Sequence, residues 1–380
     1  MKIAIVCYPT FGGSGVVATE LGLELAHKGH EIHFITYKQP VRLDLLNPNI
    51  FFHEVNVPEY ALFHYQPYEL ALSSKIVDTV KLYGIDILHV HYAIPHAFAG
   101  YMARKMLLEE GIYLPIVTTL HGTDITLVGK HPHYKTAVTF SINKSDYVTS
   151  VSESLKKDTY NYFDIKKDIY VIPNFIDAEL KNQDNADKCC RSNMALPDEF
   201  IITHISNFRS VKRVLDVVQI FNKIQEQVPA KLMMVGEGPD KAKAEELCMA
   251  LGIEHKTIFF GNTIDVDRIL KYSDLFILPS ESESFGLAAL EAMACKVPVI
   301  SSNAGGLSEV NLQGVSGFLS DIGDITDMAK NALYILEDKQ RLQTFKENAY
   351  KRAKIFNIED ILPMYLDIYQ KAIDNKEPIL

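Results

Sequence analysis

The residue types that could bind a phosphorylated substrate are concentrated in the second half of the chain. Arg209 and Lys212 stand three residues apart in SNFRSVKR, directly after the apolar run FIITHI. The end of a strand in an open α/β sheet lies at the crevice where ligands bind. Two cations there suit a diphosphate, with arginine as a bidentate fork and lysine as a point charge. Taken alone, the segment also fits a solvated basic loop.

Two glutamates lie in a second segment with related chemistry. PSESESFGLAALEAMA follows another apolar run and places Glu283 and Glu291 with seven residues between them. Phe285, Gly286 and Leu287 open a predicted helix between the two carboxylates, so backbone N–H groups at the helix N-terminus can meet an anion. A carboxylate accepts two hydrogen bonds at once, which suits a vicinal diol of a ribose or hexose. Together with the Arg–Lys pair, these groups describe a sugar-nucleotide site.

The N-terminal segment CYPTFGGSGVVATELG has the letters of a dinucleotide-binding fingerprint in residues 13–15 and Ala18. NAD binding is disfavoured, because that fingerprint places its first glycine directly after the strand and an acidic residue about 20 residues on. Here five residues separate strand from glycines, and the next apolar run ends in Thr36-Tyr37-Lys38. The glycines still precede a predicted helix. Either an anion binds at its N-terminus or the glycines serve only tight packing.

The elements that must position these residues follow from alternating apolar and helical patterns. Short β-branched or apolar runs recur through both halves, and a polar stretch near residues 174–198 separates them, although no repeat is evident in the sequence. This layout predicts two Rossmann-like α/β domains with parallel sheets facing across a cleft. The expected domains are residues 1–175 and 176–357. A final amphipathic helix, about 358–376, carries its apolar residues on one stripe and is expected to pack back on the first domain.

Composition narrows the class of protein. The formal charge of −10 argues against nucleic acid or an anionic membrane as the main partner. Five cysteines without C-x-x-C spacing are expected to be free thiols. The N-terminal apolar run is too short for a signal peptide, and no run reaches the roughly 18 residues of a membrane span. We therefore expect a cytoplasmic protein without a membrane span. The composition is also compatible with a homo-oligomer.

Two patterns that resemble metal sites have simpler interpretations. Asp265-Val266-Asp267 spells D-x-D, but it precedes a helical pattern in which aspartate serves as N-cap and first-turn charge. His89 and His91 alternate on a predicted strand and so share one face, yet no third ligand accompanies them. We expect a packing or cleft-lining role for the histidines. The turn NAGG at 303–306 is left unassigned.

The combination of motifs resembles the large family 4 of retaining glycosyltransferases with the GT-B fold. It rests on Glu-x7-Glu at 283–291, SNFRSVKR, VGEGPD at 235–240, the N-terminal GGSG, and HG at 121–122. The match runs over nearly the whole chain. More narrowly, CYPTFGGSGVVATELG, GHEIHFIT, DILHVHYAIPHA and TTLHGTDITLVG are similar to the members that make N-acetylglucosaminyl L-malate, the first intermediate of bacillithiol.

The resemblance implies roles in the donor site. Arg209 and Lys212 would hold the UDP diphosphate, Glu291 the ribose diol and Glu283 a hydroxyl of the donor sugar. The backbone amides of residues 285–287 would complete the phosphate cradle.

In the first half, the resemblance implies that His121, at the end of PIVTTLHG, faces the reacting sugar. Gly13 would line the cleft near the phosphates. Acceptor contacts would come from Ser14, Tyr92 and Thr119. Gly13 and Gly15 would also let a backbone approach a small carboxylate.

The implied reaction is a metal-independent transfer of GlcNAc from UDP-GlcNAc to the hydroxyl of L-malate, with retention and without a cofactor. The first domain would bind the acceptor and the second the nucleotide sugar. The alternatives are a related retaining transferase acting on a cell-envelope saccharide or lipid, a UDP-GlcNAc epimerase, and a non-catalytic sugar-nucleotide sensor. The presence of His121, Arg209, Lys212 and Glu283 together argues against the sensor.

Overall fold

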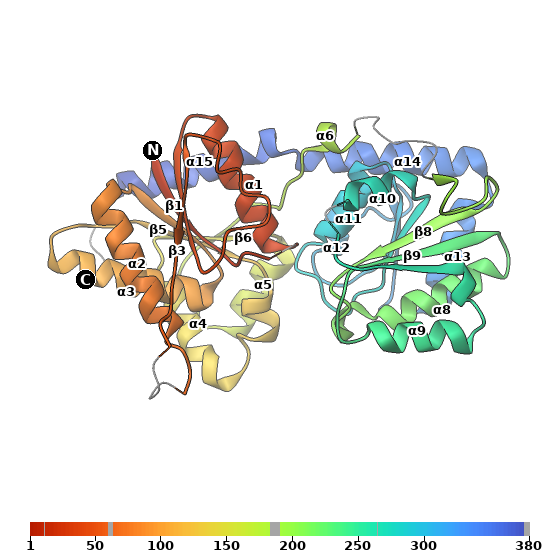
Figure 1. The fold of residues 1–380 in the computed structure, drawn as a ribbon, viewed down its shortest axis with the longest axis horizontal. Helices are drawn as coiled ribbons and strands as arrows, with labels where there is room; N and C mark the ends of the chain where they lie inside the picture. The colour runs from red at the N-terminus through yellow and green to blue at the C-terminus, as the bar shows by residue number, and fades with distance from the viewer. Residues whose placement is uncertain (11, 60–63, 183–190, 264, 376–380) are drawn as a thin grey trace. The chain divides into compact units, whose positions relative to one another are not determined.

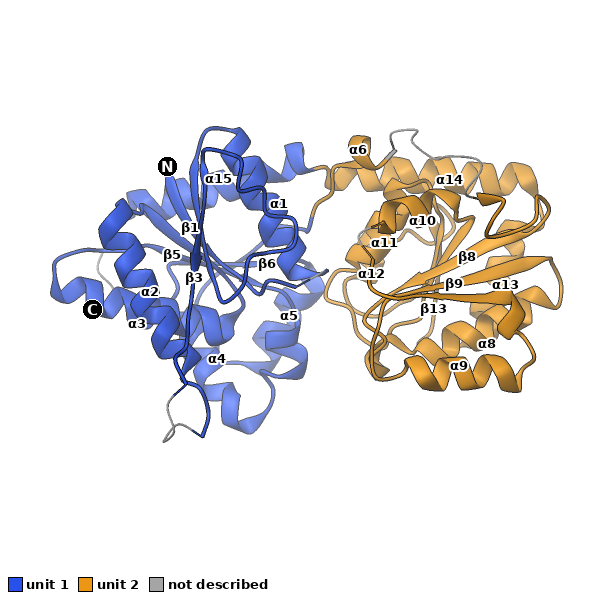
Figure 2. Ribbon diagram, viewed as in Figure 1, with its two compact units in different colours: residues 1–174, 358–380 blue, residues 175–357 orange. Residues whose placement is uncertain are grey.

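The computed structural model consists of two α/β units, each built on its own parallel sheet (Figure 1). It describes residues 1–10, 12–59, 64–182, 191–263 and 265–375. Unit 1 comprises residues 1–174 together with the C-terminal helix, and unit 2 comprises residues 175–357 (Figure 2). Cys189 and Cys190 lie outside the described residues, whereas Cys7, Cys248 and Cys295 are buried free thiols.

Unit 1 has a seven-stranded sheet in the order β3-β2-β1-β4-β5-β6-β7, with every neighbouring pair parallel. The strands are β1 Lys2–Val6, β2 Glu31–Thr36, β3 Ile50–Glu54, β4 Ile87–His91, β5 Ile116–Leu120, β6 Tyr147–Ser150 and β7 Ile169–Val171. The helices are α1 Ser14–His27, α2 Tyr68–Tyr83, α3 Phe98–Glu109, α4 Pro132–Lys144, α5 Glu153–Tyr162 and α15 Ile358–Asp374, with the short turns η1 Ala93–Ala97 and η2 Thr123–Leu127.

Unit 2 has a six-stranded parallel sheet in the order β10-β9-β8-β11-β12-β13. The strands are β8 Phe200–Ile205, β9 Ala230–Val235, β10 Thr257–Phe260, β11 Leu275–Leu278, β12 Val299–Ser302 and β13 Gly317–Ser320. The α-helices are α6 Ala178–Asn182, α8 Val214–Gln225, α9 Lys241–Ala250, α10 Val266–Tyr272, α11 Leu287–Ala294, α12 Leu307–Val310, α13 Ile325–Leu336 and α14 Lys339–Ala353. Single 3-10 turns are η3 Ser210–Lys212, η4 Glu254–Lys256 and η5 Lys354–Phe356.

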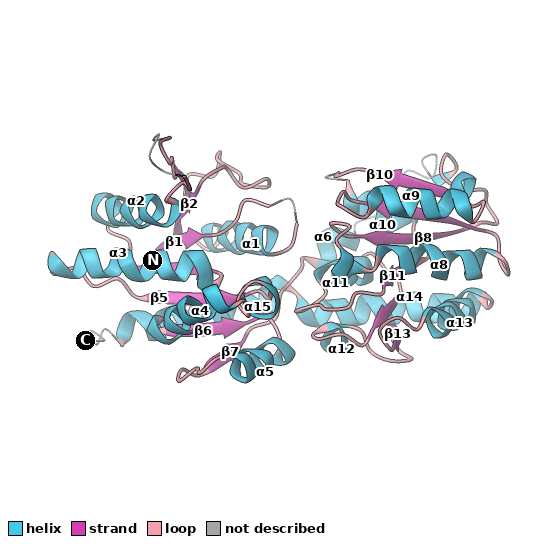
Figure 3. Ribbon diagram, turned by 90° about the horizontal axis from the view of Figure 1, so that it is seen from below, coloured by secondary structure: helices cyan, strands magenta, loops and turns pink. Residues whose placement is uncertain are grey.

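Helices cover both faces of each sheet (Figure 3). In unit 1, α2 and α3 pack on one face over a core that includes Leu88 and Val90, whereas α1 and α15 share the other. In unit 2, α8, α9 and α13 cover the larger apolar core. Parallel strands covered on both faces read as continuous apolar runs, which explains why most of them were evident in the sequence.

The C-terminal helix α15 packs on the sheet of unit 1. Its buried residues form the single stripe predicted from the sequence: Ile358, Ile361, Leu362, Tyr365, Ile368, Tyr369 and Ala372. Tyr369 lies with its hydroxyl 2.7 Å from Nδ1 of His89 on β4. The helix is therefore fixed by a buried hydrogen bond as well as by apolar packing.

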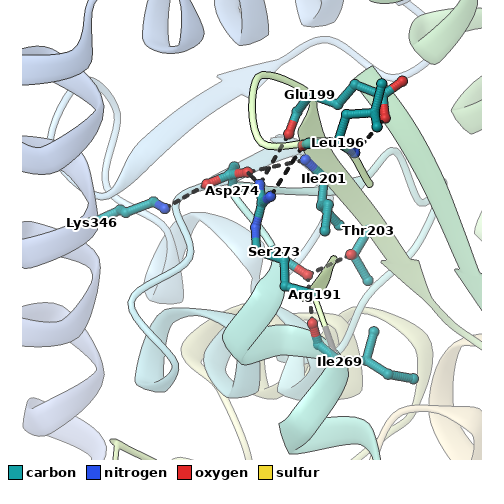
Figure 4. Close-up of polar contacts among 9 residues, drawn as sticks. All are labelled: Arg191, Leu196, Glu199, Ile201, Thr203, Ile269, Ser273, Asp274 and Lys346. Carbon is teal, nitrogen blue, oxygen red and sulfur yellow. Dashed lines mark hydrogen bonds and ion pairs between the residues drawn. The ribbon is translucent and has the colours of Figure 1, made fainter. Parts of the chain in front are cut away.

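The same Ser–Asp hydrogen-bonding arrangement joins neighbouring strands at the amino-terminal edge of both sheets, although the sequence shows no overall repeat. In unit 2, Asp274 precedes β11, and its carboxylate accepts the backbone N–H of Ile201 at 3.0 Å and pairs with Arg191 and Lys346 (Figure 4). The N–H of Asp274 in turn donates to the carbonyl of Ile201. Ser273, one residue earlier, lies 2.6 Å from the hydroxyl of Thr203 on β8.

Unit 1 repeats this arrangement. Asp146 precedes β6, exchanges backbone and side-chain hydrogen bonds with Ile116, and pairs with Arg104 at 2.7 Å. Ser145, one residue earlier, lies 2.7 Å from the hydroxyl of Thr118. Each Ser–Asp pair thus links the end of a helix to the start of the neighbouring strand. The two halves are alike in this local side-chain pattern as well as in architecture.

Candidate active site

The cations predicted to bind a diphosphate lie after β8, at the carboxyl edge of the sheet of unit 2. The chain leaves the strand at Ile205 and forms the turn η3, which places Arg209 immediately before the turn and Lys212 within it. Arg209 is exposed and, among the residues that the structure describes, has no ion-pair partner. One unpaired guanidinium is therefore available at this edge.

Lys212 is already paired with Glu283. Its Nζ lies 2.5 Å from Oε1 of Glu283, and the hydroxyl of Ser280 donates to the same oxygen at 2.9 Å. The two side chains are 21% and 12% exposed, so each charge is partly withdrawn from water. The backbone N–H of Glu281 donates to the carbonyl of Val211 and joins the two loops beneath the pair. The structure therefore brings together two residues that lie 71 positions apart in the chain.

The segment between Glu283 and Glu291 forms a helix N-terminus, as the sequence predicts. Helix α11 begins at Leu287 with Gly286 as N-cap at φ 99°, a conformation that favours glycine. Phe285 is buried, and its ring packs against that of Phe356. The first N–H groups of a helix have no partner within it, and they carry the positive end of the helix dipole. Glu291 lies in the middle of this helix, half-buried.

Glycines that the sequence analysis did not assign hold these loops in place. A Cβ on Gly236 would lie 1.9 Å from the carbonyl of Ser206, and one on Gly238 would lie 2.1 Å from that of Asn207. In the NAGG turn, a Cβ on Gly305 would lie 2.1 Å from the carbonyl of Glu283. The glycines thus let one backbone rest on another beneath the charged side chains. The turn at 303–306 and the glycines of VGEGPD therefore support the site.

His204 is a further supporting residue that the sequence analysis missed. It is buried on β8, with Nδ1 2.8 Å from the carbonyl of Ile277 and Nε2 2.8 Å from the hydroxyl of Ser206. Burial lowers its pKa to about 4. The neutral ring donates at Nδ1 and accepts at Nε2, and so fixes the first residue of the loop that carries Arg209.

In unit 1, the predicted acceptor residues Ser14 and Tyr92 meet at the carboxyl edge of the sheet. Ser14 is the first residue of α1, and its hydroxyl lies 2.6 Å from that of Tyr92, which follows β4. Gly13 is the exposed N-cap at φ 65°, and a Cβ there would have no atom of the described residues within 4 Å. The helix N-terminus, a hydroxyl pair and an open glycine are thus placed together. Gly13 has space in front of it for a ligand.

Gly15 serves a different purpose from the one expected. A Cβ at this position would lie 2.4 Å from the carbonyl of Tyr8 and 2.5 Å from the hydroxyl oxygen of Thr10. The missing side chain therefore makes room for the chain's own loop after β1. The packing explanation therefore applies to Gly15, whereas Gly13 fits the ligand explanation.

His121 lies directly after β5 and is almost completely buried. Its Nε2 lies 2.7 Å from Nδ1 of His91, and its ring centroid lies 5.2 Å from that of Tyr92. Burial lowers the pKa of His121 to about 3, with a smaller contribution from His96. The ring is therefore neutral at physiological pH and offers no charge to an anion.

Asp124 fixes the loop that carries His121. Its carboxylate accepts the backbone N–H of Gly122 at 3.0 Å and that of Ala93 at 2.8 Å, which joins the loops after β5 and β4. Burial raises the pKa of Asp124 to about 6, although the backbone N–H groups around it oppose the shift. This buried carboxyl gives the His121 loop its position.

Thr119 does not belong with the acceptor residues. Its side chain is fully buried on β5, and its hydroxyl lies 2.7 Å from Nε2 of His89 and 2.7 Å from the hydroxyl of Thr149. These contacts occupy the hydroxyl, and α15 packs against this strand. The expectation for Thr119 is therefore corrected: the residue supports the sheet behind the site.

The patterns that resembled metal sites have other partners. Asp267 lies in the first turn of α10 and pairs with Lys181, while Asp265 is the N-cap but makes no side-chain capping hydrogen bond. Asp265 thus occupies the predicted N-cap position without forming the capping hydrogen bond. His89 and His91 are fully buried. Within the described ranges, no three His, Cys, Asp or Glu side chains are arranged to hold a metal ion.

In the same part of the chain, no helix is both long and apolar enough to span a bilayer.

Comparison with known proteins identifies the family. Residues 11–180 match the model of "Glycosyltransferase Family 4", and residues 191–352 match "Glycosyl transferases group 1". The N-acetyl-alpha-D-glucosaminyl L-malate synthase of Bacillus anthracis is 46% identical over 374 residues, which cover 98% of this chain and 97% of that protein.

Solved structures agree with the fold. Anabaena Alr3699/HepE in complex with UDP-glucose gives a TM-score of 0.82 at 20% identity over 98% of this chain and 100% of its own. Sucrose-phosphate synthase from Thermosynechococcus elongatus gives 0.79 at 21% identity, with 98% of each chain covered. At this level of identity the likeness shows the GT-B fold. Together with the sequence matches, it shows that the chain belongs to family 4 of the retaining glycosyltransferases.

Proposed function

We propose that the protein transfers GlcNAc from UDP-GlcNAc to the hydroxyl of L-malate, and so makes the first intermediate of bacillithiol. The observation that carries the proposal is the 46% identity, over nearly the full length of both chains, to a protein named for making this product. Acceptor domains usually diverge first within the family, so a match that includes unit 1 bears on the acceptor.

The donor is assigned to the carboxyl edge of unit 2. Arg209 binds the diphosphate through its exposed guanidinium, and the N–H groups at the start of α11 add donors for the same oxygens. Glu291 takes the ribose diol. Lys212 and Glu283 hold each other in the absence of donor. On binding, the ammonium of Lys212 turns to the phosphate and the carboxylate of Glu283 turns to a sugar hydroxyl. Because the pair is already partly removed from water, donor binding adds less desolvation cost for these two groups.

The acceptor is assigned to the carboxyl edge of unit 1. A small dicarboxylate meets the N-terminus of α1 at Gly13 and the paired hydroxyls of Ser14 and Tyr92. One hydroxyl donates to the other, and the second donates to an oxygen of the ligand. The backbone of Gly13 leaves room for close approach. His121 contacts the reacting sugar as a neutral ring.

Retention follows from attack on the face from which UDP leaves. The malate oxygen forms the new bond to C1 of the sugar, the bond from C1 to the β-phosphate oxygen breaks, and that phosphate accepts the proton of the malate hydroxyl. Charge develops on the diphosphate, where Arg209, Lys212 and the dipole of α11 stabilise it. The remaining contribution of the protein is to hold both substrates in place.

The test is a reaction of the full chain with UDP-GlcNAc and L-malate in the presence of EDTA, followed by mass spectrometry. We expect a glycoside of malate and one equivalent of UDP. Failure with malate together with product from a cell-envelope saccharide or lipid would replace the acceptor. Consumption of UDP-GlcNAc without any acceptor would favour the epimerase.

An arginine variant tests the donor site directly. Arg209→Ala should lower kcat/KM by about 100-fold or more, because it removes a charge-assisted contact to the leaving group. Lys330→Ala is the matched control, since Lys330 is an exposed residue of α13 in the same unit. Unchanged turnover in Arg209→Ala would refute the assignment of this edge to the diphosphate.

A further inference from the structure

Four buried histidines cluster in unit 1, and one of them, His121, is the residue assigned to the reacting sugar. His89 and His91 lie on β4, His96 lies in the turn after it, and His121 follows β5. All four have pKa values lowered mainly by burial: that of His89 to about 3, that of His96 to about 4, and that of His91 well below its ordinary value. Neutral rings carry one proton each, and the position of that proton decides which nitrogen donates.

The contact between His91 and His121 can hold only one proton. Nδ1 of His91 lies 2.7 Å from Nε2 of His121, a hydrogen bond between two neutral rings. Either His91 donates from Nδ1, which leaves Nδ1 of His121 protonated, or His121 donates from Nε2, which leaves its Nδ1 without a proton. Since Nε2 of His121 is occupied, Nδ1 is the nitrogen that can meet the substrate. The two arrangements present opposite groups to it.

The other side of the His91 ring distinguishes the two arrangements. Among the residues that the structure describes, Nε2 of His91 is buried and has no hydrogen-bond partner. If His121 donated, that nitrogen would be a buried N–H without an acceptor. If His91 donates instead, its Nε2 carries no proton and is only an acceptor without a donor. Buried N–H groups without a partner are rarer than under-satisfied acceptors. The arrangement in which His91 donates is therefore favoured.

The neighbouring histidines pack around His91 and bond its backbone. Nδ1 of His96 lies 2.6 Å from the backbone carbonyl of His91 and must donate to it. The ring of His89 lies 4.4 Å from that of His91 and is itself held between Tyr369 on α15 and Thr119 on β5. The C-terminal helix thus contributes to the shell behind His91.

We propose that His91 is a positioning residue that fixes His121 in the tautomer protonated at Nδ1, so that His121 presents a hydrogen-bond donor to an oxygen of the substrate. This inference rests on the proposed function for the identity of that substrate. It makes His121 a donor to a hydroxyl, ring oxygen or developing negative charge. It excludes His121 as the base for the acceptor hydroxyl, because the nitrogen that faces the substrate has no free lone pair.

The tautomers can be measured without any substrate. Long-range proton–nitrogen spectra of the full chain labelled with [15N]histidine distinguish Nδ1–H from Nε2–H rings, and His121→Asn and His91→Asn variants assign the two signals. We expect both His91 and His121 to be protonated at Nδ1. A His121 ring protonated at Nε2 would overturn the inference. This readout is unaffected if the proposed acceptor proves wrong.

Paired substitutions test the consequence for turnover. The amide nitrogen of asparagine occupies roughly the place of Nδ1, and that of glutamine the place of Nε2. His121→Asn should therefore retain at least tenfold more kcat than His121→Gln with the same donor. The reverse order would contradict a donor at Nδ1.

Variants of His91 separate positioning from folding. His91→Asn can still donate to Nε2 of His121, whereas His91→Leu cannot. We expect His91→Leu to lower kcat about tenfold with little change in KM for the donor, and to release His121 from the Nδ1–H tautomer in the spectra. His91→Asn should recover most of kcat. If folded His91→Leu keeps both the tautomer and kcat, His91 has only a packing role.

Discussion

Unit 1 should lose stability sharply between pH 7 and pH 5, because its site is built on histidines that are buried in the neutral form. His89, His91, His96 and His121 all have folded-state pKa values lowered from 6.5 by burial. For a base whose pKa is lowered on folding, the stabilisation is complete above the unfolded pKa and is lost as the pH falls towards the folded pKa. The sensitive window therefore begins near pH 6.5 and extends to about pH 4.

The size of the effect follows from the difference in proton binding. At pH 5 an unfolded histidine is almost fully protonated, while the folded rings are not, which costs about 2 kcal/mol for each residue. Four residues give about 8 kcal/mol. Asp124 acts in the opposite direction, because its folded pKa is raised to about 6 and protonation near pH 5 relieves about 1 kcal/mol of its burial cost. The net loss of about 7 kcal/mol is comparable to the whole free energy of unfolding of a domain.

Hydrogen exchange followed by mass spectrometry resolves this loss by unit, after correction for the intrinsic rate at each pH. We expect peptides from β4, β5 and α15 to lose protection at pH 5, while those of unit 2, whose fully buried histidine on β8 is His204, change much less. His89→Gln should reduce the pH dependence by about one proton, and the exposed His27→Gln should leave it unchanged. Equal protection of unit 1 at both pH values would refute the reasoning, as would earlier opening of unit 2.

Three further substitutions test the supporting structure. Asp274→Asn should lower the free energy of unfolding of unit 2 by about 2 kcal/mol in urea denaturation followed by circular dichroism, because two cations lose their carboxylate. Gly15→Ala should destabilise unit 1 by about 2 kcal/mol in the same assay, since its Cβ overlaps the carbonyl of Tyr8. Thr119→Val should lower the melting temperature by several degrees but leave KM for the acceptor unchanged, because its hydroxyl bonds only within the core; an increase in KM would restore it to the acceptor site.

The sequence predicted most strands of the fold because fully buried parallel strands are continuous apolar runs. It did not reveal β3 and β13, two of the four edge strands. IFFHE and GFLS mix polar and apolar residues, and periodicity does not distinguish such segments from loops. The C-terminal helix, in contrast, was predicted residue by residue, because its period of 3.6 is sustained over five turns.

The sequence predicts those features of the site that depend on residue type and local spacing. Arg209 follows a strand and Glu291 lies in a helix, as their surroundings indicate. The pairing of Lys212 with Glu283 joins positions 71 apart, and no local pattern reports it. Thr119 was assigned wrongly for a related reason. Its strand is buried on both faces, and its position near the end of that strand does not predict that the distant helix α15 covers it.

The two carboxyl edges differ in charge more than in architecture, and this difference fits the proposed division of substrates. Both units close their amino edges with an aspartate that joins neighbouring strands, Asp146 in one and Asp274 in the other. At the opposite edge, unit 2 presents cations and carboxylates, whereas the histidines of unit 1 are neutral. A leaving diphosphate needs fixed charge, and we propose that the cations of unit 2 supply it. A hydroxyl that gives its proton to that phosphate needs no protein base, and in unit 1 a neutral His121 that donates from Nδ1 cannot provide one.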